Sequence, residues 1–217
     1  METFFVLKVS CCIFAPIMRE KILSNAAELF LNYGFKSITM DDISNHLGIS
    51  KKTIYQHFEN KTDLVEAVTM YVFENVACGI SEICNSKKNP IKEIFDIKQF
   101  AMDHLKDEKA SPQYQLQKYY PKIFNTLKKK QYDLMQDCVI DNLTRGVNLG
   151  LYRPTINIEF ISKIYFNCMM SLKDKELFPL TNFSMNTLME YYLEYHLRGI
   201  CTEKGLITLN KFINNQS

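Results

Sequence analysis

The chain has 217 residues, of which 47% are hydrophobic and 23% are charged. These values are typical of one or two globular domains and exclude a disordered chain. The net charge of +2 is too small for a surface that coats polyanions without specificity. Glycine and proline are few, with seven and six residues, which favours long helices over a turn-rich β fold.

The residues that usually carry chemistry are scattered along this chain. Seven cysteines occur without C-x-x-C spacing, and the four histidines are dispersed. This distribution predicts neither a disulfide framework nor a zinc site, and it fits a reducing cytoplasm. Phosphate-binding glycine loops and the common hydrolase motifs do not occur. We therefore expect no metal, no cofactor and no enzymatic activity.

The first 17 residues are apolar, but they are too few to span a bilayer. They also lack the basic start and the cleavage site of a signal peptide. We interpret residues 1–17 as an extension of unclear role, either a strand or a helical extension. A membrane anchor is the less favoured alternative, and we expect no membrane partner.

The next segment contains a pattern of three helices. Apolar residues recur at helical spacing from Arg19 to Tyr33, and Gly34 ends that helix. Thr39 begins a short helix as its N-cap, with Asp42 at the capping-box distance, and Gly48 ends it. Ser50 then caps a second short helix, predicted to run from Lys51 to Phe58, before a longer helix begins at Lys61. Two short helices joined by a tight turn are typical of a DNA-binding helix-turn-helix.

The second short helix has one inward and one outward face. Ile54 and Phe58 are four residues apart and are expected to face the core. The outward face carries two lysines and no acidic residue. Glutamine can read adenine edges, and lysine can bind guanine or phosphate. The alternative is a merely solvated face, as in a helical protein-interaction adaptor without DNA binding, but the caps and the glycine turn favour DNA.

The sequence G-I-S-K-K-T-I-Y-Q-H-F-E-N-K-T-D-L, with A-A-E-L-F-L-N-Y-G-F-K-S-I-T-M-D-D-I before it, resembles the amino-terminal domain of the tetracycline-repressor (TetR) family. The resemblance covers about Arg19 to Val68. It implies a homodimeric, all-helical transcriptional regulator, in most cases a repressor, that a small organic molecule releases from a palindromic operator in double-stranded DNA. By resemblance, the DNA-contacting positions are Thr39, Ser50, Lys51, Lys52, Thr53, Tyr55, Gln56, His57 and Lys61.

The rest of the chain also reads as helices. Prolines mark three helix starts, which predicts helices from Pro90 to about Lys106, from Pro112 to Tyr119 and from Pro121 to about Asn148. The helix from Lys61 to about Asn85 precedes these three. Two more helices are expected at 157–173 and 184–201. The tail at 202–217 is expected to dock as a short extra helix. The predicted fold class is all-α, with an amino-terminal three-helix head at 18–66 and a larger helical effector-binding and dimerisation domain at 67–217.

The last two long helices have more apolar surface than one buried stripe requires. A two-fold four-helix interface would cover the excess, so we expect a homodimer. The candidate interface residues are Ile161, Ile164, Tyr165, Cys168, Met169, Leu188, Tyr192 and Tyr195.

The helices between Pro90 and Asn148 are rich in aromatic and methionine side chains. Such side chains can line adaptable apolar pockets, although each one alone is more often ordinary core. Together with the resemblance, they predict a cavity for a small organic effector. The candidate lining residues are Phe100, Tyr114, Tyr120, Phe124 and Met135.

Overall fold

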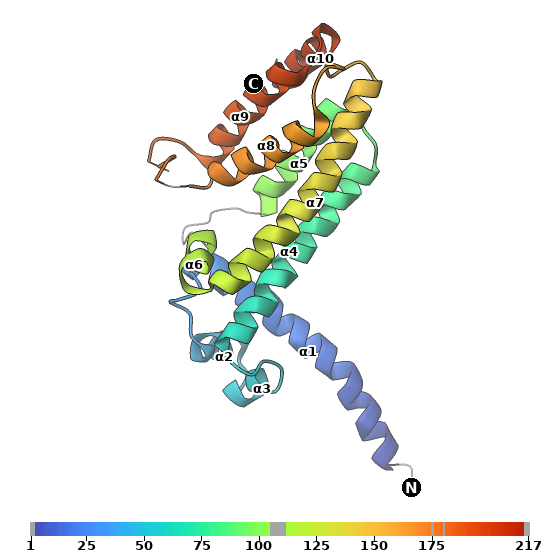
Figure 1. Cartoon of the computed structure of the whole chain (residues 1–217). Helices are drawn as coiled ribbons and strands as arrows, with labels where there is room; N and C mark the ends of the chain where they lie inside the picture. Colours follow the sequence, from blue (N-terminus) through green and yellow to red (C-terminus); the bar gives the residue numbers. More distant parts are fainter. Residues whose placement is uncertain (1–2, 105–111, 175, 180, 215–217) are drawn as a thin grey trace. The chain divides into compact units, whose positions relative to one another are not determined.

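The computed structural model describes residues 3–104, 112–174, 176–179 and 181–214, with side chains from Ile17 onward except that of His104. The described residues form ten α-helices and no strand, so the predicted all-α fold class is confirmed (Figure 1). The helices are α1 (Thr3–Tyr33), α2 (Met40–Leu47), α3 (Lys51–Tyr55), α4 (Lys61–Asn85), α5 (Pro90–His104), α6 (Pro112–Tyr119), α7 (Pro121–Asn148), α8 (Ile158–Ser171), α9 (Met185–Ile200) and α10 (Glu203–Asn214).

The chain forms two compact units. The first contains residues 1–75 and 107–129, and the second contains residues 76–106 and 130–217. Helices α4 and α7 therefore contribute residues to both units. The first unit holds the predicted three-helix head and, in addition, α6 and the first turns of α7. The division of the chain at residues 66 and 67 remains a prediction.

The core of the first unit joins the three predicted helices of the head. Phe30 of α1, Ile43 of α2, Ile54 of α3 and Leu64 of α4 are each fully buried in one apolar cluster. Leu116 of α6 packs into the same cluster. Burying a side chain of this size contributes about 1.5–3 kcal/mol relative to leaving it exposed. The cluster therefore fixes the helix-turn-helix from its inner side.

Two helix ends differ from the prediction by more than two residues. Helix α1 begins at Thr3 rather than at Arg19, so the backbone of the extension continues this helix and the strand alternative is not observed. Helix α3 ends at Tyr55 rather than at Phe58. The Ile54 carbonyl accepts hydrogen bonds from the amides of both His57 and Phe58, so the chain closes in a tighter turn there. The predicted end of α5 at Lys106 lies outside the described residues.

The second unit has an apolar core with a buried polar network beside it. Ile91, Leu143 and Leu209 are fully buried in the core, and the last of them belongs to α10, so the tail docks as the predicted extra helix. The buried carboxylate of Glu93 accepts hydrogen bonds from Arg145 Nη2, at 2.6 Å, and from Asn142 Nδ2, at 2.8 Å. Helices α5 and α7 of the second unit are therefore joined by a buried ion pair and a hydrogen bond as well as by apolar contacts.

The Tyr152 side chain extends this network. Its hydroxyl donates to Asn142 Oδ1 at 3.1 Å, and burial raises the pKa of this hydroxyl well above its usual value. The backbone of Tyr152 also forms an isolated antiparallel bridge with Cys201. The loop after α7 is therefore held between α7 and the end of α9.

Helix α4 is long and apolar enough to cross a membrane by length and composition alone. Its first half, however, carries Leu64, Val65 and Val68 into the core of the first unit, where they are buried. Cys84, close to its other end, is buried as well. Between these two ends, most side chains of α4 are half-buried or exposed.

Candidate nucleic-acid interface

The first helix of the motif is held by reciprocal capping bonds. Thr39 Oγ1 accepts from the Asp42 amide at 3.2 Å, and Asp42 Oδ2 accepts from the Thr39 amide at 2.8 Å. The Thr39 hydroxyl also donates to Asp42 Oδ2, at 2.7 Å. This bond and the bond from the Thr39 amide lower the pKa of the Asp42 carboxyl, because they favour its charged form. The predicted capping box is confirmed. The Thr39 side chain lies at the surface but is already engaged by Asp42.

The turn between the two short helices depends on one glycine. Gly48 has φ 65° and ψ 31°, a left-handed conformation that costs little without a Cβ atom. After the turn, Ser50 Oγ accepts from the Thr53 amide at 3.1 Å, and the two hydroxyl oxygens lie 2.9 Å apart. Ser50 and Thr53 therefore fix the start of α3, and their role is at least partly structural.

The outward side of α3 presents polar and aromatic side chains. Lys51, Lys52, Tyr55 and Gln56 are exposed, and Thr53 and His57 are half-buried. The Lys51 ammonium lies 2.9 Å from Asp41 Oδ1, and this hydrogen-bonded pair raises the pKa of Lys51. Exposed ion pairs contribute little, so a phosphate can replace this partner. Among the described side chains, none forms an ion pair with Lys52, which leaves its charge available to a ligand.

Lys61 lies at the start of α4 and is half-buried. Its ammonium donates to the Lys36 carbonyl at 3.3 Å, and burial lowers its pKa. The Lys36 amide in turn donates to Gln115 Oε1 of α6 at 3.1 Å. Sequence reasoning missed the exposed Lys36, whose only signal was a basic residue in the turn before the motif. It also missed that α6 contacts this turn.

The predicted interface residues of α8 and α9 have different surroundings. Tyr165 and Leu188 are buried within the second unit, so the chain itself already covers their surface. Ile161, Cys168, Met169 and Tyr192 are half-buried, and only Ile164 and Tyr195 of the predicted set are exposed. The large outward side chains on these helices are Phe160, Ile164, Tyr191 and Tyr195, with exposed fractions of 60%, 41%, 62% and 79%.

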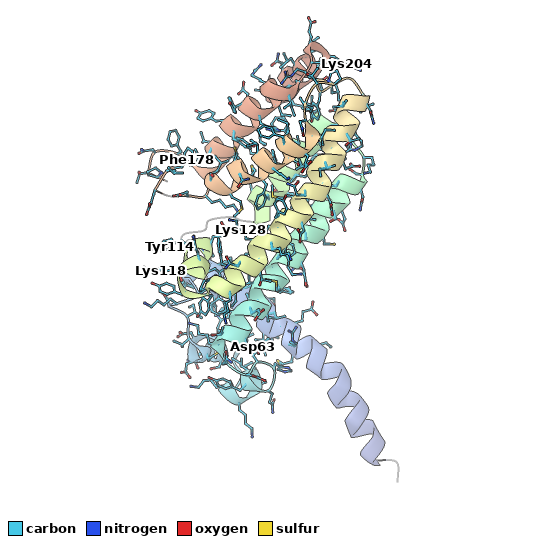
Figure 2. The ribbon with its side chains drawn as sticks, viewed as in Figure 1. Asp63, Tyr114, Lys118, Lys128, Phe178 and Lys204 are labelled. Atoms are coloured by element: carbon cyan, nitrogen blue, oxygen red, sulfur yellow. The ribbon has the colours of Figure 1, made fainter. Side chains whose placement is uncertain are left out.

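The predicted effector-lining residues are divided between the units. Tyr114, Tyr120 and Phe124 belong to the first unit, and Phe100 and Met135 belong to the second. Tyr114 is exposed, with Lys118 Nζ 5.5 Å from its ring centroid, and both side chains lie on α6 (Figure 2). Phe124 and Tyr120 pack against the first core, and Met135 packs against the second. These five residues do not form one cluster within either unit.

The capped helices, the left-handed turn and the exposed basic side of α3 define a helix-turn-helix DNA-binding protein with an all-helical remainder. Residues 22–68 match the family described as bacterial regulatory proteins, tetR family. This segment of the chain is therefore similar to the DNA-binding segment of tetR-family transcriptional regulators.

Individual relatives support this assignment. The activator FasR of Mycolicibacterium smegmatis is 34% identical over 64 residues, which cover 30% of this chain and 29% of FasR. The repressor KstR2 of the same species is 22% identical over 150 residues, which cover 66% of this chain and 71% of KstR2. A TetR-family regulator from Agrobacterium tumefaciens shares the fold, with a TM-score of 0.67 at 18% identity over 85% of this chain and 97% of that one. These relatives are transcriptional regulators rather than enzymes.

Proposed function

We propose that the chain is a cytoplasmic, homodimeric repressor that reads a palindromic operator through α3 and leaves it when a small organic molecule binds. The observation that carries this proposal is the outward side of α3, where Lys52 and Gln56 are exposed beside an inner residue, Ile54, that is fully buried. A rigidly seated helix with polar outward side chains can enter a major groove. Repression is proposed because KstR2 is named a repressor and IcaR a negative regulator, whereas FasR is named an activator. Release by an effector rests on the resemblance to the TetR family.

The two kinds of DNA contact have different expected roles. Lys52, Thr53 and Gln56 are proposed as the base readers, and Tyr55, His57 and Lys61 chiefly as phosphate contacts. Lys51 can join either group once Asp41 is displaced. Thr39 and Ser50 position the two helices through their capping bonds, whether or not they also touch a phosphate.

The base-reading proposal predicts unequal effects of Gln56→Ala and Lys61→Ala. Gln56→Ala should relax the preference at one operator position by about 1–3 kcal/mol, because a bidentate base contact is lost. Lys61→Ala should weaken all sequences similarly and lower the slope of log affinity against log salt by roughly 0.9, because one phosphate contact is lost. Gel shifts over a salt series, with a duplex selected from a random pool by the wild-type protein, measure both.

A matched control is available for these measurements. Lys128 is an exposed lysine on α7 in the first unit, within a run of three lysines that is expected to be only solvated (Figure 2). Lys128→Ala makes the same charge change as Lys61→Ala and should leave affinity and salt slope close to those of the wild type. If Gln56→Ala and Lys61→Ala also behave like the wild type at every salt concentration, the recognition-helix proposal is wrong.

The proposed dimer uses the exposed side chains of α8 and α9. Phe160 and Ile164 lie four residues apart on α8, and Tyr191 and Tyr195 lie four residues apart on α9, so each pair shares one side of its helix. Exposed aromatic residues of this kind are unusual on a monomer and frequent at the centre of interfaces. A second copy of the chain is the occupant that a two-fold operator requires.

Tyr195→Asp should shift the chain from dimer to monomer. A central tyrosine contributes about 2 kcal/mol or more to an interface, so the dissociation constant should rise by roughly 30-fold or more. Light scattering after size-exclusion chromatography over a dilution series measures this change. Tyr33→Asp, which alters a tyrosine of 62% exposure on α1, serves as the control. A wild-type chain that is monomeric at micromolar concentration would exclude the dimer.

The proposed effector is a small, largely apolar organic molecule bound by the residues that follow the head. The aromatic and methionine content of these helices supports an apolar ligand. To cause a tenfold loss of DNA affinity, it needs a coupling free energy of only about 1.4 kcal/mol. Native mass spectrometry of the protein purified from cells tests whether a copurifying small molecule is bound.

A further inference from the structure

Three ring side chains meet where α8 and α9 lie side by side in the second unit (Figure 1). The ring centroid of Tyr165 on α8 lies 5.8 Å from that of Tyr192 and 5.1 Å from that of His196, both on α9. The Tyr192 and His196 centroids are 5.7 Å apart. The Tyr192 hydroxyl donates to the Tyr165 carbonyl at 3.4 Å, which joins the two helices. We refer to these three residues as the ring cluster.

Two polar groups of the ring cluster lack a hydrogen-bond partner among the described residues. They are the Tyr165 hydroxyl and the His196 imidazole, although the two residues are only 9% and 8% exposed. Within the described part of the chain, no side-chain nitrogen or oxygen is both shielded from solvent and without a partner. Both groups therefore retain contact with solvent, so a small polar group can reach them in an otherwise enclosed position.

The surroundings of the ring cluster are apolar and adaptable. The second unit has two apolar clusters, and both Tyr192 and Met169 pack against each of them. Three more methionines pack in the smaller of these clusters: Met102, Met185 and Met189. Methionine has an unbranched, polarisable side chain that fits ligands of varied shape and makes favourable contacts with aromatic rings. These surroundings suit an apolar, aromatic molecule.

The ring cluster carries no charge near neutral pH. Burial lowers the pKa of His196 to about 4 and raises the pKa of the Tyr165 hydroxyl. Lys98, one turn before Met102 on α5, is buried, but its ammonium lies 2.7 Å from Glu190 Oε1. A carboxylate ligand would therefore lose its hydration without gaining an unpaired cation. A neutral hydroxyl or carbonyl group suits the site better, because a neutral imidazole and a tyrosine hydroxyl can each donate or accept.

We propose that the ring cluster binds an uncharged aromatic molecule with one hydroxyl or carbonyl group, and that this molecule is the effector, a role that rests on the proposed function. Tyr165 and His196 hydrogen-bond its polar group, and the methionines cover its rings. None of the five lining residues predicted from the sequence belongs to the ring cluster. The proposed dimer surface lies on the outward sides of the same two helices, so a ligand that moves α8 against α9 also changes the dimer.

Three two-ring probes of similar size test the ligand class: 2-naphthol, naphthalene and 2-naphthoate. In isothermal titration calorimetry with the full chain, 2-naphthol should bind at least about tenfold more tightly than 2-naphthoate, because the anion is buried without a free cation. Tyr165→Phe removes one hydroxyl and should weaken 2-naphthol binding about fivefold, the effect of one hydrogen bond, without changing the affinity for naphthalene. Tyr132→Phe, which removes the hydroxyl of a tyrosine that packs on Phe166, should behave like the wild type.

The location is tested by nuclear magnetic resonance of the four histidine rings. The His196 signal is assigned by its loss in His196→Phe. Addition of 2-naphthol should shift this signal and leave that of His46, an exposed residue of the first unit, in place. Four results would each overturn the proposal: no binding of 2-naphthol at millimolar concentration, tighter binding of 2-naphthoate, full affinity of Tyr165→Phe for 2-naphthol, or an unshifted His196 signal.

The effector role is tested with a duplex that the ligand-free wild type selects from a random pool. Saturating 2-naphthol should lower the affinity for this duplex by at least about fivefold, the low end of coupling between sites. Tyr165→Phe should need a higher concentration of 2-naphthol for the same loss. Unchanged DNA affinity with the probe bound would overturn the effector role alone. If the wild type selects no duplex, the proposed DNA-binding function fails, and the titrations still decide the ligand site.

Discussion

Arg145→Met should lower the free energy of unfolding by about 3–5 kcal/mol, because it leaves the buried Glu93 carboxylate without its cationic partner. The Glu93 side chain is 1% exposed, and Arg145 Nη2 lies 2.6 Å from its Oε1 atom. Burial of the guanidinium lowers its pKa, but the hydrogen bonds to Glu93 and Asp141 outweigh this effect and raise the pKa of Arg145. Urea denaturation followed by circular dichroism measures the loss.

Two further variants show whether the unpaired charge is the cause. Glu93→Gln combined with Arg145→Met keeps the shape of the side chain and an acceptor for Asn142 but removes the carboxylate, so the double variant should be more stable than Arg145→Met alone. Lys163→Met breaks the exposed Glu159–Lys163 pair and should leave the unfolding midpoint within experimental error. A double variant as unstable as Arg145→Met would mean that lost packing, rather than charge, dominates.

Acidification from about pH 6.5 to about pH 4 should destabilise the second unit through His196. Burial lowers the pKa of this imidazole to about 4 from an ordinary value of 6.5. The unfolded chain therefore binds a proton in this window that the folded chain does not. The histidine's contribution is complete above pH 6.5, falls as the pH falls, and levels off below pH 4. The shift corresponds to about 3 kcal/mol in total.

The pH dependence is isolated by comparing His196→Phe with the wild type. Phenylalanine can keep the aromatic contacts with Tyr165 and Tyr192, whose ring centroids lie 5.1 Å and 5.7 Å from that of His196. As the pH falls from about 6.5 to about 4, the stability of the wild type relative to His196→Phe should decrease by about 3 kcal/mol. His46→Gln, which removes an exposed histidine, should leave the profile unchanged. Parallel profiles of wild type and His196→Phe would contradict the assignment.

The local parts of the fold could be predicted from the sequence because their signals are local. The Thr39 capping box, the Gly48 turn and the proline at the start of α7 each depend on residues within one turn of the chain. The inward positions Ile54 and Phe58 follow from helical spacing, and both are buried. Most of the candidate DNA-binding surface could therefore be placed without coordinates.

The remaining features depend on contacts between distant residues. The Glu93–Arg145 pair joins residues 52 positions apart, and no periodicity links them. On α8, a broad apolar arc does not distinguish Tyr165, which the chain itself buries, from Ile164, which it leaves exposed. Which side faces the interior is decided only when α9 and the other helices pack against it. The same reason explains why the contact between α6 and the turn at Lys36 was missed.

The position of Gln115 has a spectroscopic consequence. The Lys36 amide donates to Gln115 Oε1, and the Lys36 carbonyl accepts from Lys61, so one peptide segment is held from two helices of the first unit. An amide with a side-chain acceptor exchanges with solvent only when that bond opens. The nuclear magnetic resonance signal of this single amide therefore reports how often α6 leaves the turn. A reporter placed beside Lys61 can follow motion at the DNA-binding side of the molecule without a label on the DNA.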